Sequence, residues 1–504
     1  MPRVCSLLVV LALAAGSLAA QQPRLGTVDF PTSASTAAQA EFIRGVLYLH
    51  SFEYGDAAAA FRAAQRIEPR FALAYWGEAL TFDHPLWNEH DREAGLAALQ
   101  RLAPTPEARA ATAPTDRERR YLEAAELLFG GTGSKAKRDT LYAAAMERLH
   151  SAYPDDDEAA AFYALSLMGL SQGYRDLPTY MRAGAMALEL LSRHPDHPGA
   201  AHYVIHAFDD PTHAPLGLPA ARAYSRIAPG ADHAQHMTTH IFLALGMWDD
   251  VVRQNEIASG PDRSTWVPGH YTYWLQYGLL QQGRVDQARA LLDNVRRNPG
   301  ATANPRRRAH LLAMRAAQVV NGERWDDPAL SWQLDTAGVG TGALALDAFA
   351  RGIAALRRGD TGTARTALAS LQSLESAASQ GGWGGQPGVR AALARELEGA
   401  LAFERGEREV GLRLAAEAAA IEDGLVVEYG PPDVVKPAHE MQAEMLLALG
   451  RPAEAQQAFT RALQVTPGRL PALRGLARAA REAGDGAVAA RAERELAAQQ
   501  RSGE

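Results

Sequence analysis

Cysteine and lysine are both scarce in this chain of 504 residues. The one cysteine is Cys5, and lysine occurs only at positions 135, 137 and 436, so arginine carries nearly all of the positive charge. Beyond Cys5 the sequence offers no disulfide, no thiolate metal ligand and no cysteine nucleophile. The formal net charge is −7. Because a nucleic-acid surface normally needs a basic stripe, we expect no nucleic-acid partner.

Sustained apolar runs are also missing, except at the start of the chain. Arg3 precedes an apolar run from Val4 to Ala15, and small residues through Ala20 follow it. This order predicts a signal peptide at 1–20. The run is too short to span a bilayer, and no later stretch approaches about 18 uncharged apolar residues, so we expect no membrane span in the mature chain. The protein is therefore expected to be exported, periplasmic or secreted, and its arginine and alanine bias is typical of a bacterial source.

A set of small and aromatic residues recurs at identical spacing near the two ends of the chain. The first set is Gly45, Tyr48, Ala57, Phe61, Ala64 and Pro69, and the second is Ala443, Leu446, Ala455, Phe459, Ala462 and Pro467. The pattern resembles the tetratricopeptide repeat (TPR) family, whose unit of 34 residues is a pair of antiparallel helices. The resemblance implies an all-α fold, a right-handed α-solenoid of stacked antiparallel helix pairs, with a concave groove for a protein or peptide partner.

The repeat pattern and its interruptions divide the sequence into segments. We expect a signal peptide at 1–20, N-terminal TPR units at 21–105, central helical units with insertions at 106–195, His-rich TPR units at 196–300, degenerate helical repeats with a Gly-rich loop at 301–435, and C-terminal TPR units at 436–504. Neighbouring units stack, so together they supply a continuous core that no single unit can form.

Histidines follow the same period in the middle of the chain. His202 and His206 are four residues apart, as are His236 and His240, so each pair shares one helix face. The two pairs are separated by 34 residues, and a further step of 34 from His236 reaches His270. Three consecutive first helices thus carry imidazole at an equivalent place, which the resemblance places toward the groove. Helices that pack about 8–10 Å apart could bring these rings together.

Three interpretations of these five histidines compete. They could bind a divalent transition metal (Zn, Fe, Cu or Ni), because neutral imidazole is a common ligand for these ions. They could instead line a groove for an anionic or peptide ligand, or bond to one another and to water while packing the repeats. Their shared register favours the metal site, with His233, Asp209 and Asp210 as supporting residues.

Further polar and aromatic residues fall at groove-facing places. Glu440 and Glu444 occupy, in the last clear repeat, the places that His202 and His206 occupy upstream, and a superhelical turn could bring them to the cluster. A wall for a ligand is predicted from Trp76, Asp83, His84, Trp274 and Tyr277. For the N-terminal members of this set, a packed core is the competing interpretation.

Zinc-protease and nucleotide-binding motifs are missing from the sequence, which contains no HExxH and no P-loop. Two functions remain. One is an exported TPR solenoid with a His-rich, metal-binding groove, in which any catalysis would depend on the metal. The other is a protein- or peptide-binding scaffold with no metal and no catalysis.

Overall fold

The computed structural model describes residues 23–172, 175–376, 386–426 and 429–502. The expected signal peptide at 1–20 and most of the Gly-rich stretch lie outside these ranges. Helices provide almost all of the regular structure, as the sequence predicts, and the fold is an all-α solenoid of stacked helix pairs. Among the helices of the described ranges, none has the length and apolar character needed to cross a membrane.

The helices follow one another with short connections. The first group is α1 (Thr36–His50), α2 (Tyr54–Ile67), α3 (Ala72–Leu80), α4 (Arg92–Gln100), α5 (Pro106–Ala110), α6 (Asp116–Ala125), α7 (Lys135–Ala152) and α8 (Asp157–Gly169). The second group is α9 (Leu177–Arg193), α10 (Pro198–Phe208), α11 (Ala214–Ile227), α12 (Asp232–Ala244), α13 (Trp248–Ala258), α14 (His270–Gln281), α15 (Val285–Arg297) and α16 (Pro305–Asn321). The third group is α17 (Thr341–Arg357), α18 (Thr361–Ser376), α19 (Pro387–Glu404), α20 (Arg408–Asp423), α21 (Ala438–Ala448), α22 (Pro452–Val465), α23 (Leu470–Ala483) and α24 (Gly486–Ser502).

A few short elements interrupt this order. Strands β1 (Asp83–His84) and β2 (Glu89–His90) form an antiparallel pair between α3 and α4. Single 3-10 turns lie at Pro85–Trp87, Arg263–Thr265 and Pro328–Ser331, and a π-helical turn lies at Glu126–Gly130.

The repeat residues recognised in the sequence are the contacts that hold the helix pairs together. Phe61 of α2 fills the space between α1 and α3, and a β-carbon placed on Gly45 or Gly77 would lie 2.6 Å or 2.4 Å from its ring. Phe459 of α22 packs in the same way against Gly475 of α23. Glycine is needed at these positions because the aromatic ring takes the space of a side chain.

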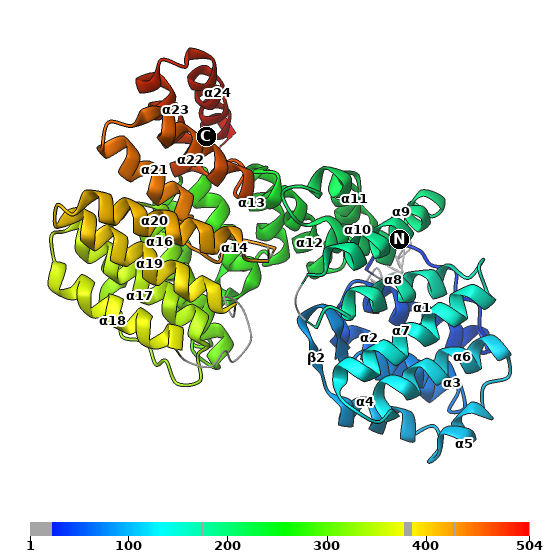
Figure 1. Ribbon diagram of the computed structural model, residues 1–504. Helices are drawn as coiled ribbons and strands as arrows, with labels where there is room; N and C mark the ends of the chain where they lie inside the picture. Colours follow the sequence, from blue (N-terminus) through cyan, green and yellow to red (C-terminus); the bar gives the residue numbers. More distant parts are fainter. Residues whose placement is uncertain (1–22, 173–174, 377–385, 427–428, 503–504) are drawn as a thin grey trace, which may run out of the picture.

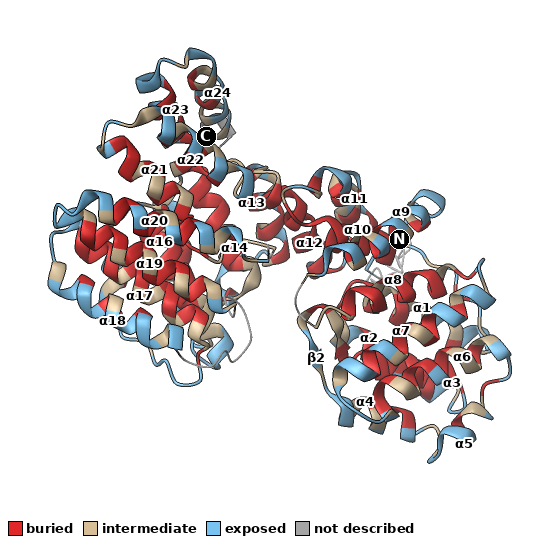
Figure 2. Cartoon of the chain, viewed as in Figure 1, coloured by how far each residue is buried: buried red, intermediate tan, exposed pale blue. Residues whose placement is uncertain are grey.

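Both ends of the chain pack against its middle. Helices α1 and α8 contact α10. The turn before α23 contacts α13 and α14, because Trp248 Nε1 donates to the carbonyl oxygen of Gly468 at 2.9 Å and the Leu470 amide donates to Gln281 at 2.9 Å. Figure 1 shows α10–α13, in green, between the blue and cyan N-terminal lobe and the yellow to red C-terminal half. All of α10, and all of α12 except Asp232, is buried (Figure 2). A helix that is buried all round belongs to the interior of the molecule.

Candidate metal centre

Six imidazoles from three helices gather in two groups of three in this interior. The first triad is His202 and His206 of α10 with His233 of α12, and the second triad is His236 and His240 of α12 with His270 of α14. Within each triad, one nitrogen of each ring lies within 4.8 Å of the others. The structure thus brings together all five predicted ligands, and it adds His233 as an equal member rather than a supporting residue.

The two triads are neighbours. The ring centroids of His206 and His240 are 5.5 Å apart, and those of His233 and His236 are 6.2 Å apart. Helix α12 supplies residues to both triads, because residues three and four apart lie close together on one helix face.

Hydrogen bonds fix the tautomers of His236 and His240 in the second triad. His236 Nδ1 lies 2.7 Å from Asn255 Oδ1, and the Asn255 amide nitrogen donates to the Val251 carbonyl, so His236 Nδ1 is the donor. His240 Nδ1 donates in the same way to Asp209 Oδ2 at 2.8 Å. In the neutral rings both Nε2 atoms therefore carry lone pairs, and these atoms face each other at 3.3 Å. Two lone pairs at this distance repel unless a cation lies between or beside them.

Among the described residues, the Nε2 atom of each ring in the first triad lacks a hydrogen-bond partner. His202 Nδ1 donates to the backbone carbonyl of His50 at 2.7 Å, so its Nε2 carries the lone pair. The Nε2 atoms of His202, His206 and His233 are all buried and have no hydrogen-bond partner within the described ranges. Buried polar atoms without partners are costly. Single ones occur elsewhere in the described residues, at His90, His150 and His197, but here three lie in one cluster.

The electrostatics of the cluster keep every ring neutral. Burial lowers the pKa of His202 to about 3 and that of His236 to about 4. Burial, followed by repulsion from neighbouring imidazoles, lowers the pKa of the other members in the same direction. Neutral imidazole is the form that binds metal, so at pH 7 the cluster is ready to act as a ligand set.

Asp209 orients the site but is already engaged. Its Oδ1 pairs with Arg175 at 2.6 Å, while its Oδ2 accepts the His240 proton. His206, Asp209 and His240 do form a two-histidine, one-carboxylate group, but Asp209 could serve as a ligand only by giving up the His240 hydrogen bond. Asp210 lies further from the triad histidines. It pairs with Arg175 at 2.9 Å and accepts hydrogen bonds from the backbone amides of Thr212 and His213, in the loop that leads into α11. Asp209 thus contacts a triad histidine directly, whereas the partners of Asp210 are Arg175, Thr212 and His213.

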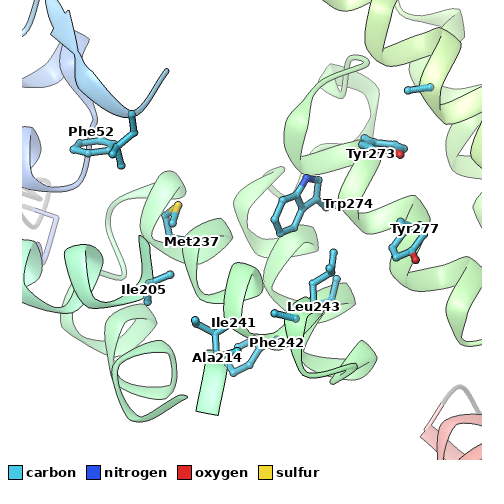
Figure 3. Close-up of a cluster of buried hydrophobic side chains, with 14 of the residues drawn as sticks. Phe52, Ile205, Ala214, Met237, Ile241, Phe242, Leu243, Tyr273, Trp274 and Tyr277 are labelled. Carbon is cyan, nitrogen blue, oxygen red and sulfur yellow. The ribbon is translucent and has the colours of Figure 1, made fainter. Parts of the chain in front are cut away.

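Aromatic side chains enclose the rings. Trp274, predicted as a groove residue, lies 4.5 Å from His240 between ring centroids, and Tyr429 covers the same ring at 5.0 Å. Phe52 lies 4.3 Å from His202 and occupies the left-handed backbone region at φ 55°, a conformation that persists only where surrounding contacts enforce it. Figure 3 shows Phe52 and Trp274 approaching from different parts of the chain around α12.

A pocket of about 470 Å³ opens beside the cluster. One ligand of each triad, His233 and His270, contributes to its wall. Predicted His84 also lines it, stacked on Tyr54 with ring centroids 3.9 Å apart. The cluster can therefore be reached from this pocket.

Other predicted groove residues lie elsewhere. Trp76 is fully buried among the aromatic rings of the N-terminal lobe, so the packed-core interpretation holds and the ligand wall is wrong for it. Asp83 is buried and pairs with His90 at 2.7 Å. Tyr277 is buried against Trp248, because its place on α14 faces the neighbouring helix rather than an open surface.

Glu440 and Glu444 belong to a separate ion-pair network. Glu440 is buried and binds Lys436 at 2.9 Å and Arg469 at 2.6 Å, and Lys436 also binds Glu444 at 2.6 Å. Glu444 additionally pairs with Arg357 at 3.1 Å. These basic partners occupy the two carboxylates, so the expectation that they support the histidines is not met.

A third buried group shows what a structural histidine cluster looks like in this protein. His50 contacts the Tyr203 hydroxyl at 2.8 Å through Nδ1 and Glu158 at 2.7 Å through Nε2. His197 accepts the Ala200 amide on Nδ1 and lies 3.2 Å from Glu158 through Nε2. Both nitrogens of His50 thus have protein partners, and His197 Nε2, although it lacks a hydrogen bond like the Nε2 atoms of the first triad, has a carboxylate beside it.

Four contributors to the site are not among the predicted site residues. They are Arg175 before α9, Asn255 of α13, Phe52 in the turn after α1, and Tyr429 in the loop before α21. Arg175, Phe52 and Tyr429 lie in connections outside the repeat pattern, whereas Asn255 occupies a repeat position equivalent to Phe61, where a polar residue is the one available signal.

Comparisons with known proteins give a distant likeness. No family model and no curated protein matches the chain. The TPR domain of P58(IPK) is 12% identical and covers 89% of this chain and 99% of its own, with a TM-score of 0.25. Yeast Tom70 is 12% identical with a TM-score of 0.29, covering 92% of each chain. Human IFIT1 with PPP-AAAA is 14% identical, covering 90% of this chain and 94% of its own, with a TM-score of 0.39.

These neighbours are TPR proteins, the family that the repeat spacing resembles. At such low identity and TM-scores they carry no argument about function. The fold described above rests on the helices of this chain, and function must be argued from the site itself.

Proposed function

We propose that this protein is an exported metal-binding solenoid in which each histidine triad holds one divalent transition-metal ion. The observation that carries the proposal is the set of buried, unsatisfied ring nitrogens. Three Nε2 atoms of the first triad have no described partner, and two of the second triad face each other at 3.3 Å with their Nδ1 protons held elsewhere. An ion in each triad would satisfy these nitrogens together.

The contrast with the His50 and His197 pair separates this proposal from a structural role. In that pair the Glu158 carboxylate hydrogen-bonds to His50 and lies 3.2 Å from His197 Nε2, which makes no hydrogen bond. In the two triads, the oxygens that accept from His202, His236 and His240 all lie at Nδ1, behind the rings. Such outer hydrogen bonds fix the tautomer and raise the basicity of metal-bound imidazoles.

The ligand set favours copper or zinc. All six ligands are neutral nitrogens, whereas magnesium, calcium and manganese prefer carboxylate and other oxygen ligands. A non-heme iron site would use two histidines and a carboxylate, but Asp209 is already bound to Arg175 and His240. Among divalent ions of the first transition row, copper binds a given nitrogen site most tightly. Three nitrogens also leave a four-coordinate ion one open position.

Elemental analysis of the purified mature protein tests the proposal. The protein, prepared without affinity metal, is incubated with copper or zinc and desalted, and metal is measured by plasma mass spectrometry. We expect about two ions per chain in the wild type and about one in His206→Gln or His240→Gln, because each variant removes a ligand from one triad.

The variant His194→Gln serves as the control, since His194 is exposed and pairs with Asp157 outside the cluster. It should keep both ions. A wild type that binds no metal after incubation with either ion would refute the proposal and leave the scaffold function, with a protein or peptide partner.

Export is a separate part of the proposal and rests on residues 1–20 of the sequence. It predicts that the protein made in a bacterial host begins after Ala19 or Ala20 and fractionates with the periplasm or the medium. An intact N-terminus in the cytoplasmic fraction would contradict it. N-terminal mass spectrometry of each fraction gives the answer without reference to metal content.

A further inference from the structure

The pocket beside the triads has the size and position of a ligand site. Its volume of about 470 Å³ falls within the range of small-molecule pockets in proteins. His233 of the first triad and His270 of the second both contribute to its wall. A molecule in this pocket could therefore reach the open coordination positions of both ions.

Five aromatic side chains also line this wall. They are Phe52, Tyr54, Trp87, Trp266 and Tyr271. Trp87 is only half-buried and lies edge-on to His233, with ring centroids 5.8 Å apart. Because aromatic rings favour edge-to-face and offset-stacked neighbours, such walls select a planar ring over an aliphatic one.

The metal-loaded site carries excess positive charge, which an anionic ligand would neutralise. Six neutral imidazoles offset none of the charge that two divalent ions bring, and the carboxylate of Asp209 is already paired with Arg175. Of the acidic groups lining the pocket, Glu89 pairs with His84 at 3.3 Å and Arg306 at 3.5 Å, and Glu53, which accepts the His233 amide at 2.9 Å, supplies one negative charge against the four positive charges of two ions. A buried, uncompensated positive charge is unfavourable, and a ligand oxygen anion would offset it.

We propose that the pocket binds a phenolate or catecholate, with its ring against the aromatic wall and its oxygen bound to the metal ions. The inference rests on the metal-binding function proposed above and adds the chemical class of the ligand. The ring accounts for the aromatic lining, and the ionised hydroxyl accounts for the uncompensated charge.

Titration of the copper-loaded protein with 4-nitrocatechol tests the inference, because the visible absorbance of this probe shifts on metal binding. We expect it to bind at least about tenfold more tightly to the loaded protein than to protein treated with EDTA, since coordination supplies much of the affinity. The non-aromatic cyclohexane-1,2-diol, measured by competition, should bind at least about tenfold more weakly than the probe.

Two variants change the pocket without replacing a metal ligand. Trp87→Leu removes part of the aromatic wall, and Thr265→Trp fills the pocket from an exposed position in its lining. Each should weaken probe binding at least about fivefold with the metal content unchanged. Trp325→Leu is the matched control, because Trp325 is half-buried like Trp87 but lies outside the pocket lining.

The outcomes separate the two proposals. A wild type without metal overturns the metal-binding function and this inference with it. A wild type that holds its metal but binds the probe no better than the EDTA-treated protein overturns this inference alone. Equal affinity for the probe and the aliphatic diol also overturns this inference alone. Unchanged probe binding in both pocket variants does so too.

Discussion

Lowering the pH should reduce the local stability of the metal-free protein around the histidine triads. Burial holds the pKa of His202 at about 3 and that of His236 at about 4, whereas an exposed imidazole titrates near about 6.5. As the pH falls below about 6.5, the unfolded or locally opened chain binds a proton on each ring and the folded chain does not. The stability of the folded form is therefore present above this pH and is lost progressively below it.

The size of the effect follows from the pKa values. Each ring contributes about 1.4 kcal/mol per pH unit below about 6.5. Between about pH 6.5 and pH 5, one ring therefore loses about 2 kcal/mol and the two together about 4 kcal/mol, which is a large share of the stability of a typical domain. Glu422 acts in the opposite sense, because burial raises its pKa to about 7 and the folded state then holds a proton that the unfolded chain releases.

Hydrogen exchange measured by mass spectrometry at pH 7 and pH 5 checks this prediction. Protein treated with EDTA is compared with the double variant His202→Gln/His236→Gln, following peptides from α10 and α12. After correction for intrinsic exchange rates, the opening free energy of the wild type should fall by about 4 kcal/mol more than that of the variant. The Glu422 contribution cancels in this difference. Equal pH dependence in the two proteins would show that these rings titrate normally and refute the reasoning.

Three further substitutions test separate contacts. Asn255→Leu removes the acceptor behind His236 and should weaken metal binding by about 10- to 100-fold in chelator competition; unchanged affinity would contradict that role. Glu440→Ala leaves the buried Arg469 without its carboxylate, while Lys436 keeps Glu444, and should cost about 3–5 kcal/mol in denaturant unfolding, which a neutral result would rule out. Gly45→Ala places a methyl group 2.6 Å from the Phe61 ring and should cost about 1–3 kcal/mol, with Gly55→Ala, where no atom lies within 4 Å, as control.

The repeat fold could be predicted because it depends on short-range spacing. The spacing of Phe61 and its flanking glycines predicts both the helix pair and its contact with the next helix. The same spacing around Phe459 predicts this arrangement a second time. The return of the C-terminal units to α13 and α14 could not be predicted in this way. It depends on single contacts such as Trp248 to Gly468, which connect residues more than two hundred positions apart and follow no period.

The histidine cluster could be predicted from its period, but its division into two triads could not. His202 and His236 are each the fifth residue of their helix, as the step of 34 requires. His270 keeps that step but is the first residue of α14, because Pro268 and Gly269 precede it and delay the helix. This shift and the direction of the His233 side chain together separate the six rings into two groups. Neither the shift nor the side-chain direction can be predicted from residue spacing alone.

Helix α12 takes part in both triads, with His233 in the first and His236 and His240 in the second. An ion in one triad would restrict the motion of this helix, so the second ion would meet ligands that are already ordered. The two binding events are then coupled, and the coupling is reciprocal: a ligand lost from one triad weakens the affinity of the other. Repulsion between two divalent ions in neighbouring triads acts in the opposite direction. Native mass spectrometry of a titration measures the balance, and a half-loaded chain that stays a minor species would show that the ordering of α12 outweighs the repulsion.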